Sequence, residues 1–367
     1  MAEKVKIGII GVGQIGKRHV AAYQKLPVEL VAVADVDEAE ARKVAAENGI
    51  PKTFTRFRDL LATEEIEAVD VCLHNNLHAP VSIAAMEAGK HVYCEKPIAG
   101  AYVDGKAMVE AARKTGRMLS IQLGSLFGME TKAALRLIQE GYLGKLYYAK
   151  SVGFRRRGRP YVDGYGTCSF VQQAVAAGGA LFDMGVYHIA QMLYLLGNPA
   201  VETVSGATHQ EIPMYPDRQA ISSYDVEELG VGFVRLAGGA TLSVEESWAL
   251  HLAEPGVGSR LVGSRGGIRI SPFAYFSTVT DMEMDATFDL ESANWRWHQC
   301  IPDTDAYDSP QAHWVAALQG RVPLIDTAGL ALATMRISEG IYLSTRLGRE
   351  VTPAEIEEQS KSTAIKM

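Results

Sequence analysis

The chain has 367 residues, of which 47% are hydrophobic and 22% are charged, the composition of a folded globular protein. This length is large for one hydrophobic core and suits two domains. The formal net charge of -7 gives no broad attraction to nucleic acid or to anionic membranes, so neither is an expected partner.

The four cysteines are scattered along the chain and form no CxxC pair: Cys72, Cys94, Cys168 and Cys300. Neither a zinc site nor a disulfide framework is therefore expected, and reduced thiols are typical of cytoplasmic proteins. An apolar run begins at Val5 and leads directly into a glycine motif, which favours a first strand over a signal peptide. We expect no bound metal and a cytoplasmic location.

Strands and helices alternate through the first 124 residues. Apolar runs of strand length lie at 5–10, 30–34, 69–73, 91–94 and 118–123. Helices are expected between them, at 16–25, 38–48, 80–88 and 106–115, and the last three each end at a glycine. This alternation predicts an α/β domain at 1–124 with a doubly wound parallel sheet.

The pattern changes after residue 124. A helix at 131–139 precedes a strand that runs from about residue 144 to 154. Strand-like segments with glycine turns then follow from 201 to about 270 with no helices between them, so a large, mostly antiparallel sheet is expected. Two helices follow, at 311–318 and 327–345. Residues 125–367 are therefore assigned to a second, α+β domain.

The first strand leads into a GxGxxG pattern at residues 11–16, and this pattern also opens a helix. Gly11 permits the tight turn, Gly13 lets the backbone approach a pyrophosphate, and Gly16 lets the helix pack closely on the strand. Phosphates then lie at the helix N-terminus, where free N–H groups and the helix dipole favour negative charge. The motif predicts dinucleotide contacts at Gly11, Gly13, Gln14, Ile15 and Gly16.

Asp35 follows the second strand, 24 positions after Gly11, near the usual place of the acid that binds the ribose hydroxyls. A carboxylate there repels a 2′-phosphate, and Asp37 adds to the repulsion. The cofactor is therefore expected to be NAD in preference to NADP. Without the glycines, Asp35 would be interpreted as a turn or helix-capping aspartate.

Three further segments identify a family. Residues 89–97 read Gly-Lys-His-Val-Tyr-Cys-Glu-Lys-Pro, residues 75–78 read Asn-Asn-Leu-His, and residues 178–185 read Gly-Gly-Ala-Leu-Phe-Asp-Met-Gly. With their order, their spacing and the ending Arg-Leu-Gly-Arg-Glu-Val at 346–351, they resemble the glucose–fructose oxidoreductase and inositol dehydrogenase family over essentially the whole chain. The resemblance implies an NAD-binding Rossmann domain and a second domain that holds the substrate and supports homodimers or homotetramers.

The resemblance also implies an active site at Lys96 and Asp183, with Asn75, His78 and Glu95 at the nicotinamide end of the cofactor. Oxidation of a secondary alcohol requires a hydride acceptor, a proton acceptor and a group that stabilises the developing alkoxide. A lysine ammonium can donate to that oxygen, and burial readily lowers a lysine pKa. Lys96 is expected in this role because it ends a strand of a parallel sheet, where ligands bind; a surface lysine is the alternative.

Many family members have histidine four residues after the aspartate, whereas here Tyr187 holds that position and His188 follows it. On a regular helix Asp183 and Tyr187 lie about 40° apart, while His188 lies about 140° from Asp183. A tyrosine at this position resembles the glucose–fructose oxidoreductase branch, in which it transfers the proton. We expect Tyr187 to exchange the proton, with His188 as the competing candidate; either can instead be a packed side chain.

Arg155, Arg156 and Arg157 follow the first strand of the second domain, near the substrate cleft by analogy with the family. One or two of them can bind an anionic substituent, and a solvated run of charges is the other interpretation. Further candidates for stacking or hydrogen bonding to a sugar are Tyr161, Asp163, Tyr165, Trp248 and His251.

These features predict an NAD-dependent oxidoreductase that transfers hydride between nicotinamide and a hydroxyl carbon of a sugar or cyclic polyol. Two alternatives use the same dinucleotide fold: a glycoside hydrolase that recycles bound NAD through oxidation, elimination and reduction, and a non-catalytic NAD sensor. The presence of both Lys96 and Asp183 argues against the sensor. Products distinguish the hydrolase, since its cycle yields no net NADH.

Overall fold

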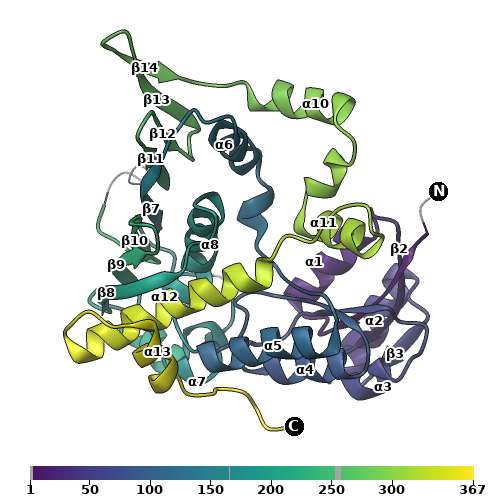
Figure 1. Cartoon of the computed structure of the whole chain (residues 1–367). Helices are drawn as coiled ribbons and strands as arrows, with labels where there is room; N and C mark the ends of the chain where they lie inside the picture. The colour runs from purple at the N-terminus through teal and green to yellow at the C-terminus, as the bar shows by residue number, and fades with distance from the viewer. Residues whose placement is uncertain (1–2, 165, 253–257) are drawn as a thin grey trace.

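The computed structural model describes residues 3–164, 166–252 and 258–367 and contains two sheets with helices packed around them (Figure 1). The first sheet has six parallel strands in the order β3-β2-β1-β4-β5-β6. Its strands are β1 (Val5–Ile10), β2 (Val28–Ala34), β3 (Lys52–Phe54), β4 (Ala68–Val71), β5 (His91–Cys94) and β6 (Leu119–Ile121). Its helices are α1 (Gln14–Tyr23), α2 (Glu38–Asn48), α3 (Phe57–Leu61), α4 (Asn75–Glu87) and α5 (Tyr102–Thr115). In this doubly wound topology, ligands bind outside the carboxyl ends of the strands.

The expected parallel sheet is confirmed, and β1, β5 and α2 begin and end where the sequence predicts. Strand β3 and helix α3 were not expected, because they are only three and five residues long and too short to show a periodic pattern. Helix α4 begins at Asn75, before the predicted start at Pro80, so the proline lies inside the helix.

The C-terminal tail compensates for Pro80. Because proline has no backbone N–H, the carbonyl of Asn76, four residues earlier, loses its usual helical partner. The N–H of Ile365 donates to this carbonyl at 3.1 Å. Close by, the N–H of Thr363 donates to Oδ2 of Asp104 in α5 at 2.9 Å. The tail therefore crosses the first turns of two helices and satisfies a carbonyl that α4 cannot satisfy itself.

The second sheet has eight strands in the order β14-β13-β12-β11-β7-β10-β9-β8. The strands are β7 (Leu146–Phe154), β8 (Val201–His209), β9 (Leu229–Leu236), β10 (Thr241–Ser247), β11 (Arg260–Gly263), β12 (Gly267–Arg269), β13 (Ala274–Val279) and β14 (Met282–Ala286). All neighbours are antiparallel except β7 and β10, so the mostly antiparallel sheet is confirmed. The expectation of no intervening helix is wrong, because α9 (Pro216–Ser222) lies between β8 and β9. The strands also continue past residue 270.

Most of the remaining helices pack around the second sheet, and α11 packs on the first domain. The remaining helices are α6 (Met129–Gln139), α7 (Gln173–Ala176), α8 (Val186–Leu195), α10 (Leu290–Cys300), α11 (Pro310–Leu318), α12 (Thr327–Leu347) and α13 (Pro353–Gln359). Single turns of other helix types are η1 (Gly124–Phe127), η2 (Cys168–Val171), the π-helix η3 (Leu181–Gly185) and η4 (Thr304–Tyr307). Helices α8 and α12 pack on the sheet face toward the first domain, and the other face is turned outward (Figure 1).

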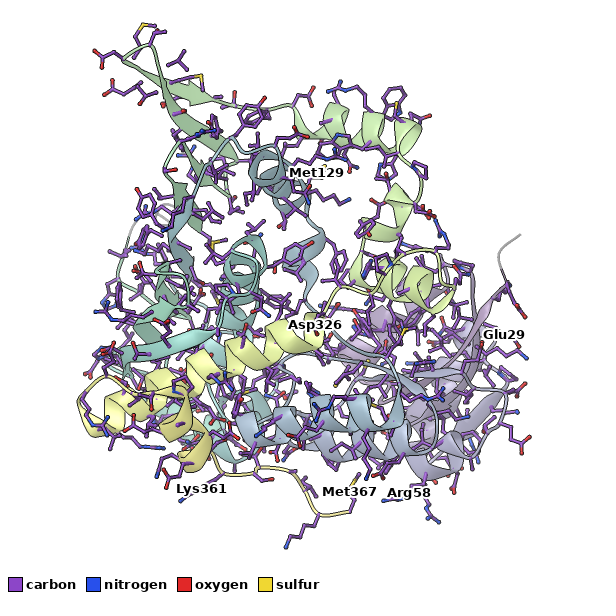
Figure 2. All side chains as sticks on the ribbon, viewed as in Figure 1. Glu29, Arg58, Met129, Asp326, Lys361 and Met367 are labelled. Atoms are coloured by element: carbon purple, nitrogen blue, oxygen red, sulfur yellow. The ribbon has the colours of Figure 1, made fainter. Side chains whose placement is uncertain are left out.

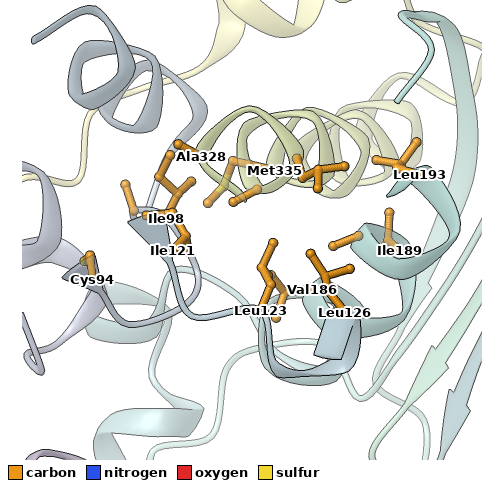
Figure 3. Packing of buried hydrophobic residues seen from close by; sticks show 14 of the residues in the cluster. Cys94, Ile98, Ile121, Leu123, Leu126, Val186, Ile189, Leu193, Ala328 and Met335 are labelled. Carbon is orange, nitrogen blue, oxygen red and sulfur yellow. The ribbon is translucent and has the colours of Figure 1, made fainter. Parts of the chain in front are cut away.

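Helix α12 joins the two halves of the molecule through one hydrophobic core. Figure 3 shows Ala328 and Met335 of α12 with Ile121 of β6 on one side and Ile189 and Leu193 of α8 on the other. Helix α12 contacts α5 and β6 as well as α8 and β8. This continuous packing holds the two sheets in a fixed relation, and the site between them depends on that relation.

The C-terminal half also contributes to the first core, since Trp314 of α11 packs beside Tyr93 of β5. The domain boundary at residue 124 therefore stays a prediction, because residues on both sides of it share the first core. Figure 2 shows charged side chains at the edge of the molecule, among them Glu29, Arg58 and Lys361. Within the described ranges, no helix combines the length and hydropathy needed to cross a bilayer.

Candidate active site

The loop between β1 and α1 has the geometry that its glycines predict. Gly11 has a φ of 91°, which glycine adopts readily, and a Cβ there would lie 2.4 Å from the carbonyl oxygen of Cys72. A Cβ on Gly16 would lie 2.1 Å from the carbonyl oxygen of Gly11. A Cβ on Gly13, in contrast, would meet no described atom within 4 Å. The open side of the loop is therefore beside Gly13, where a pyrophosphate is expected.

The helix that follows suits an anionic group. Gly13 is the N-cap of α1, and the described residues provide neither a side-chain cap nor an acidic residue in the first turn. The first N–H groups of the helix are thus free to bind phosphate oxygens. Asp35 lies at the edge of this loop, where its carboxylate accepts the N–H of Val12 at 2.8 Å and that of Asp37 at 3.0 Å. These residues fit a bound dinucleotide, and the ribose contact of Asp35 stays a prediction.

Lys96 and Asp183 are 87 positions apart in the chain, and the fold brings them into an ion pair. The Nζ of Lys96 donates to Oδ1 of Asp183 at 2.9 Å and to its backbone carbonyl at 3.0 Å. The other carboxylate oxygen accepts the indole N–H of Trp248 at 2.9 Å. The Lys96 and Asp183 side chains are only 13% and 17% exposed, so water screens the pair little. Each oxygen of the carboxylate is therefore held by a different donor.

This pairing decides the charge of Lys96. Burial alone would lower the pKa of its ammonium, but Asp183 together with Tyr187 and Glu95 raises that pKa. Burial would likewise raise the pKa of the Asp183 carboxyl, whereas the charge of Lys96 lowers it. The expectation that burial lowers the lysine pKa is therefore wrong. The raised pKa keeps the Lys96 ammonium a charged hydrogen-bond donor.

Asp183 lies in the π-helix η3, which continues directly into α8. The i→i+5 bonding of a π-helix gives a wider turn than an α-helix, and such turns are frequent at functional sites. The predicted 140° separation assumed a regular α-helix, and the wider turn brings His188 to the side of Asp183. Asp183, Tyr187 and His188 all line one pocket. The expectation that only Tyr187 shares the face of Asp183 is therefore wrong.

The pocket has a volume of about 460 Å³, within the range of small-molecule sites. It opens beside the end of β7, opposite the π-helix. Its lining residues are Val152, Gly153, Phe154, Arg155, Asp183, Met184, Tyr187, His188, Gly258 and Ser271.

The two candidates for proton transfer have different surroundings. The ring centroid of Tyr187 lies 4.9 Å from the Nζ of Lys96. Burial raises the pKa of the Tyr187 hydroxyl, and the charge of Lys96 opposes this. The Nδ1 of His188 lies 2.9 Å from Oε2 of Glu246, a carboxylate with no exposed surface. Burial would lower the pKa of His188, but the charge of Glu246 raises it.

Glu246 is held in turn by Ser151, whose hydroxyl donates to Oε1 at 2.6 Å. A Cβ on Gly153 would lie 2.2 Å from the His188 ring and 2.5 Å from Oε2 of Glu246, so glycine is required beside this pair. With Nδ1 bound to Glu246, Nε2 is the ring nitrogen that can meet a ligand. Sequence reasoning missed Glu246 and Ser151, because their strands show only an ordinary alternation of polar and apolar residues.

Two residues expected at the nicotinamide end hold backbone segments. His78 is fully buried; its Nδ1 lies 2.8 Å from the carbonyl oxygen of Pro97 and its Nε2 lies 3.0 Å from that of Leu73. Asn75 donates its side-chain N–H to the carbonyl of Ala176 in α7 at 2.8 Å. The predicted contact of His78 with the ribose is therefore wrong, since both ring nitrogens are used inside the protein.

Glu95 also has internal partners, and its ribose contact stays a prediction. Its Oε1 lies 3.0 Å from Nε2 of His19, and its Oε2 accepts the N–H of Lys96 at 2.9 Å. The Nδ1 of His19 lies 2.8 Å from Oδ2 of Asp70. Sequence reasoning missed His19 and Asp70. The available signals were a histidine three residues after Gly16, on the buried side of α1, and an aspartate inside the otherwise apolar strand β4.

Asp163 and Trp248 were expected to contact a sugar, and the structure buries both. The Asp163 side chain is 3% exposed and accepts hydrogen bonds from Arg157 at 3.2 Å and Arg159 at 3.0 Å. Trp248 has no exposed surface, and its indole N–H is bound to the active-site carboxylate. Both expectations are wrong, because one side chain fixes the loop after β7 and the other positions Asp183.

Arg155 borders the pocket, with its Nη1 4.0 Å from a carboxylate oxygen of the ion pair. Arg156 and His251 are exposed and do not line the pocket. Tyr161 packs on a small core cluster of the second domain. Tyr165 lies outside the described residues. Of the predicted substrate residues that the structure describes, only Arg155 lies at the pocket.

Two family models match this chain. One describes an oxidoreductase family with an NAD-binding Rossmann fold and matches residues 5–123, and the other describes the GFO/IDH/MocA C-terminal domain and matches residues 131–269. The chain belongs to the GFO/IDH/MocA oxidoreductase family.

The relatives of this oxidoreductase include sugar and polyol dehydrogenases. D-glucoside 3-dehydrogenase of Escherichia coli K12 is 26% identical over 355 residues, which cover 95% of this chain and 97% of that protein. Myo-inositol 2-dehydrogenase of Thermotoga maritima is 27% identical over 199 residues, or 54% of this chain and 57% of that protein. A solved structure of levoglucosan dehydrogenase with NADH and levoglucosan aligns with a TM-score of 0.78 at 23% identity, covering 95% and 99% of the two chains. Because the two chains are only 23% identical, this structural match is evidence for a shared fold and not for a shared substrate.

Family membership confirms the Rossmann fold, NAD as the cofactor and oxidoreductase activity. Because the relatives are enzymes, the alternative of a non-catalytic NAD sensor is not supported. The NAD-recycling glycoside hydrolase is not favoured, because the relatives named above are dehydrogenases.

Proposed function

We propose that this oxidoreductase removes hydride from a secondary hydroxyl carbon of a sugar or cyclic polyol bound beside Lys96 and Asp183. The observation that carries the proposal is the buried ion pair between these residues, at a pocket of about 460 Å³. Similarity to a D-glucoside dehydrogenase over 95% of the chain supports a sugar. Arg155 at the pocket keeps an acidic sugar in the substrate panel.

NAD bound along the loop at residues 11–16 supplies the hydride acceptor. Lys96 stabilises the negative charge that develops on the reacting oxygen, since Asp183 keeps its ammonium charged. Two of the three ammonium N–H donors bind Asp183, which leaves the third for the substrate oxygen. Trp248 fixes Asp183 from the other side, so the lysine is aimed by a carboxylate that is itself held.

We assign the proton transfer to Tyr187, with His188 as the alternative. Tyr187 lies against Lys96, whose positive charge favours loss of the phenol proton. His188 is oriented by Glu246 in the manner of a histidine base with a carboxylate partner. Comparing Tyr187→Phe with His188→Asn separates the roles, because the proton-transfer residue lowers kcat when removed and the other changes mainly KM.

The test incubates the enzyme and NAD with polyols, free sugars, acidic sugars and glycosides, and follows NADH absorbance and product release together. NADH accumulating with a sugar or polyol supports the proposal. Aglycone release without net NADH contradicts it.

Lys96→Ala is expected to abolish turnover while NAD affinity changes little. Lys132→Ala is the matched control, since Lys132 is 14% exposed and also binds a carboxylate, that of Asp308 at 3.0 Å. Full turnover in Lys96→Ala, or equal losses in both variants, would refute the role of Lys96.

We also infer that the enzyme is a cytoplasmic homodimer or homotetramer. Phe233 of β9 alternates with Gly232, which faces Ile341 of α12, so its 39% exposed side chain lies on the outward face and supports the oligomer inference. Light scattering after size-exclusion chromatography measures the subunit number, and a monomer would contradict the inference of a homo-oligomer.

A further inference from the structure

A buried network of ionisable side chains joins α1 to the segment that carries Lys96. The His19 side chain, on α1, is 4% exposed. Its Nδ1 lies 2.8 Å from Oδ2 of Asp70 in β4, and its Nε2 lies 3.0 Å from Oε1 of Glu95, which follows β5. The Asp70 and Glu95 side chains are 0% and 12% exposed. Nothing in the proposed mechanism uses His19, yet it occupies one of the most buried polar positions of the first domain.

The two contacts require a charged imidazole. A neutral histidine has one N–H donor, so one of the two carboxylates would face a lone pair; the imidazolium donates to both. Burial would lower the pKa of His19, but the charge of Asp70 raises it well above the ordinary value. Burial would raise the pKa of the Glu95 carboxyl, and the hydrogen bond from His19 lowers it. His19 is therefore a fixed positive charge of the folded enzyme.

Cys72 completes the network, with its Sγ 3.3 Å from Nδ1 of His19 and 3.3 Å from Oδ1 of Asp70. These three side chains have the atoms of a metal site. The 2.8 Å approach of Nδ1 to Oδ2 is, however, that of a direct hydrogen bond, and the two atoms satisfy each other without an ion.

Glu95 carries the constraint from His19 to the reaction site. One oxygen of its carboxylate binds His19 and the other accepts the backbone N–H of Lys96 at 2.9 Å. Lys96 then reaches Asp183. The N-terminus of α1 lies at the expected pyrophosphate position, while the buried side of the same helix holds the Lys96 segment. Helix α1 therefore positions both the expected pyrophosphate site and the Lys96 segment.

We propose that His19 is a positioning residue that fixes Glu95 and the backbone of Lys96 against α1 and so shapes the nicotinamide end of the NAD site. The pyrophosphate and the adenosine ribose do not depend on it, because the glycine loop and Asp35 form their expected sites through their own backbone contacts. This inference uses the proposed function only in placing Lys96 at the reacting end of the cofactor.

The test measures binding of NADH and of ADP-ribose, which lacks nicotinamide, by calorimetry. His19→Gln keeps a polar side chain of similar length and removes the charge. NADH affinity is expected to fall about tenfold, which corresponds to about 1.4 kcal/mol of binding free energy, while ADP-ribose affinity stays unchanged. Equal weakening of both ligands would mean that α1 itself is disturbed, and no change in either would mean that His19 positions nothing; both outcomes overturn the proposal.

His313→Gln is the matched control. His313 is 1% exposed and accepts the N–H of Ile325 at 2.9 Å, but it makes no hydrogen bond to the network of His19, Asp70, Cys72 and Glu95. Its replacement removes an equally buried histidine and is expected to leave the ratio of NADH to ADP-ribose affinity unchanged.

Glu95→Gln provides a second, milder variant if His19→Gln folds poorly. Because Glu95 carries the effect of His19, the double variant should lose little more NADH affinity than either single variant, and additive losses would overturn the coupling. The ratio of NADH to ADP-ribose affinity does not depend on which sugar is oxidised. Failure of the sugar assays would therefore leave it intact, whereas failure of the unaltered enzyme to bind NADH would reject the dinucleotide site itself.

Discussion

Replacing Trp248 by phenylalanine isolates one hydrogen bond of the active site. Trp248 is fully buried, and its indole N–H donates to Oδ2 of Asp183 at 2.9 Å. Phenylalanine keeps an aromatic ring but has no donor. A hydrogen bond to a charged group contributes about 1.5–3 kcal/mol. Since about 1.4 kcal/mol corresponds to a factor of ten in rate, loss of this bond should lower kcat/KM about 10- to 100-fold if it positions Asp183 in the transition state.

Trp314→Phe separates this bond from the loss of ring volume. Trp314 is also fully buried, but its indole N–H has no hydrogen-bond partner among the described residues. Both variants should lower the free energy of unfolding because each leaves a small cavity. Only Trp248→Phe should also lose turnover.

The assay follows NADH formation with the substrate from the panel, and thermal unfolding gives the stability of each variant. Equal turnover losses in the two variants would show that packing alone is responsible. Full turnover in Trp248→Phe, with the stability loss present, would refute the argument that Trp248 holds Asp183 for catalysis.

Three further predictions concern separate contacts. His188 has a raised pKa in the folded enzyme, so its protonation stabilises the fold below the ordinary histidine pKa, and this contribution is lost as pH rises through the folded-state pKa. Glu246→Gln removes the charge that opposes burial, and urea unfolding should show a larger loss of stability at pH values below about 6.5 than at alkaline pH; a uniform loss would argue against the ion pair. Asp35→Ser should weaken NADH binding and strengthen NADPH binding in fluorescence titrations, and an unchanged preference would mean that Asp35 does not face the ribose. Deletion of residues 361–367 removes the hydrogen bonds to Asn76 and Asp104 and should lower Tm, whereas an unchanged Tm would show that the tail adds nothing to stability.

The sequence alone determined the parts of this protein that depend on local backbone chemistry. Gly11 and Gly16 occupy positions where a Cβ would collide with the backbone, so their spacing after an apolar strand was sufficient to predict the loop. Lys96 and Asp183 were identified through motifs that resemble a family. Such signals are readable because the residue type is required by its own backbone position or by a short segment around it.

The tertiary structure decided which side chains meet and what charge they carry. Trp248 binds Asp183 across 65 positions, and Glu246 binds His188 across 58. Trp248 and Asp163 were expected at a sugar and are instead buried partners of other protein groups. A polar residue does not reveal its partner in the sequence, because that partner comes from a distant segment and is chosen by the packing of the whole domain.

The π-helix and the charge of Lys96 are two further features that the sequence alone did not predict. A regular helix predicted that His188 turns away from Asp183, and one wider turn reversed this. Burial predicted a lowered pKa for Lys96, and its neighbours, first among them a carboxylate 87 positions away, reversed that too. In a site with little water, neighbouring charged groups together can outweigh the cost of burial, and only the folded chain determines which neighbours are present.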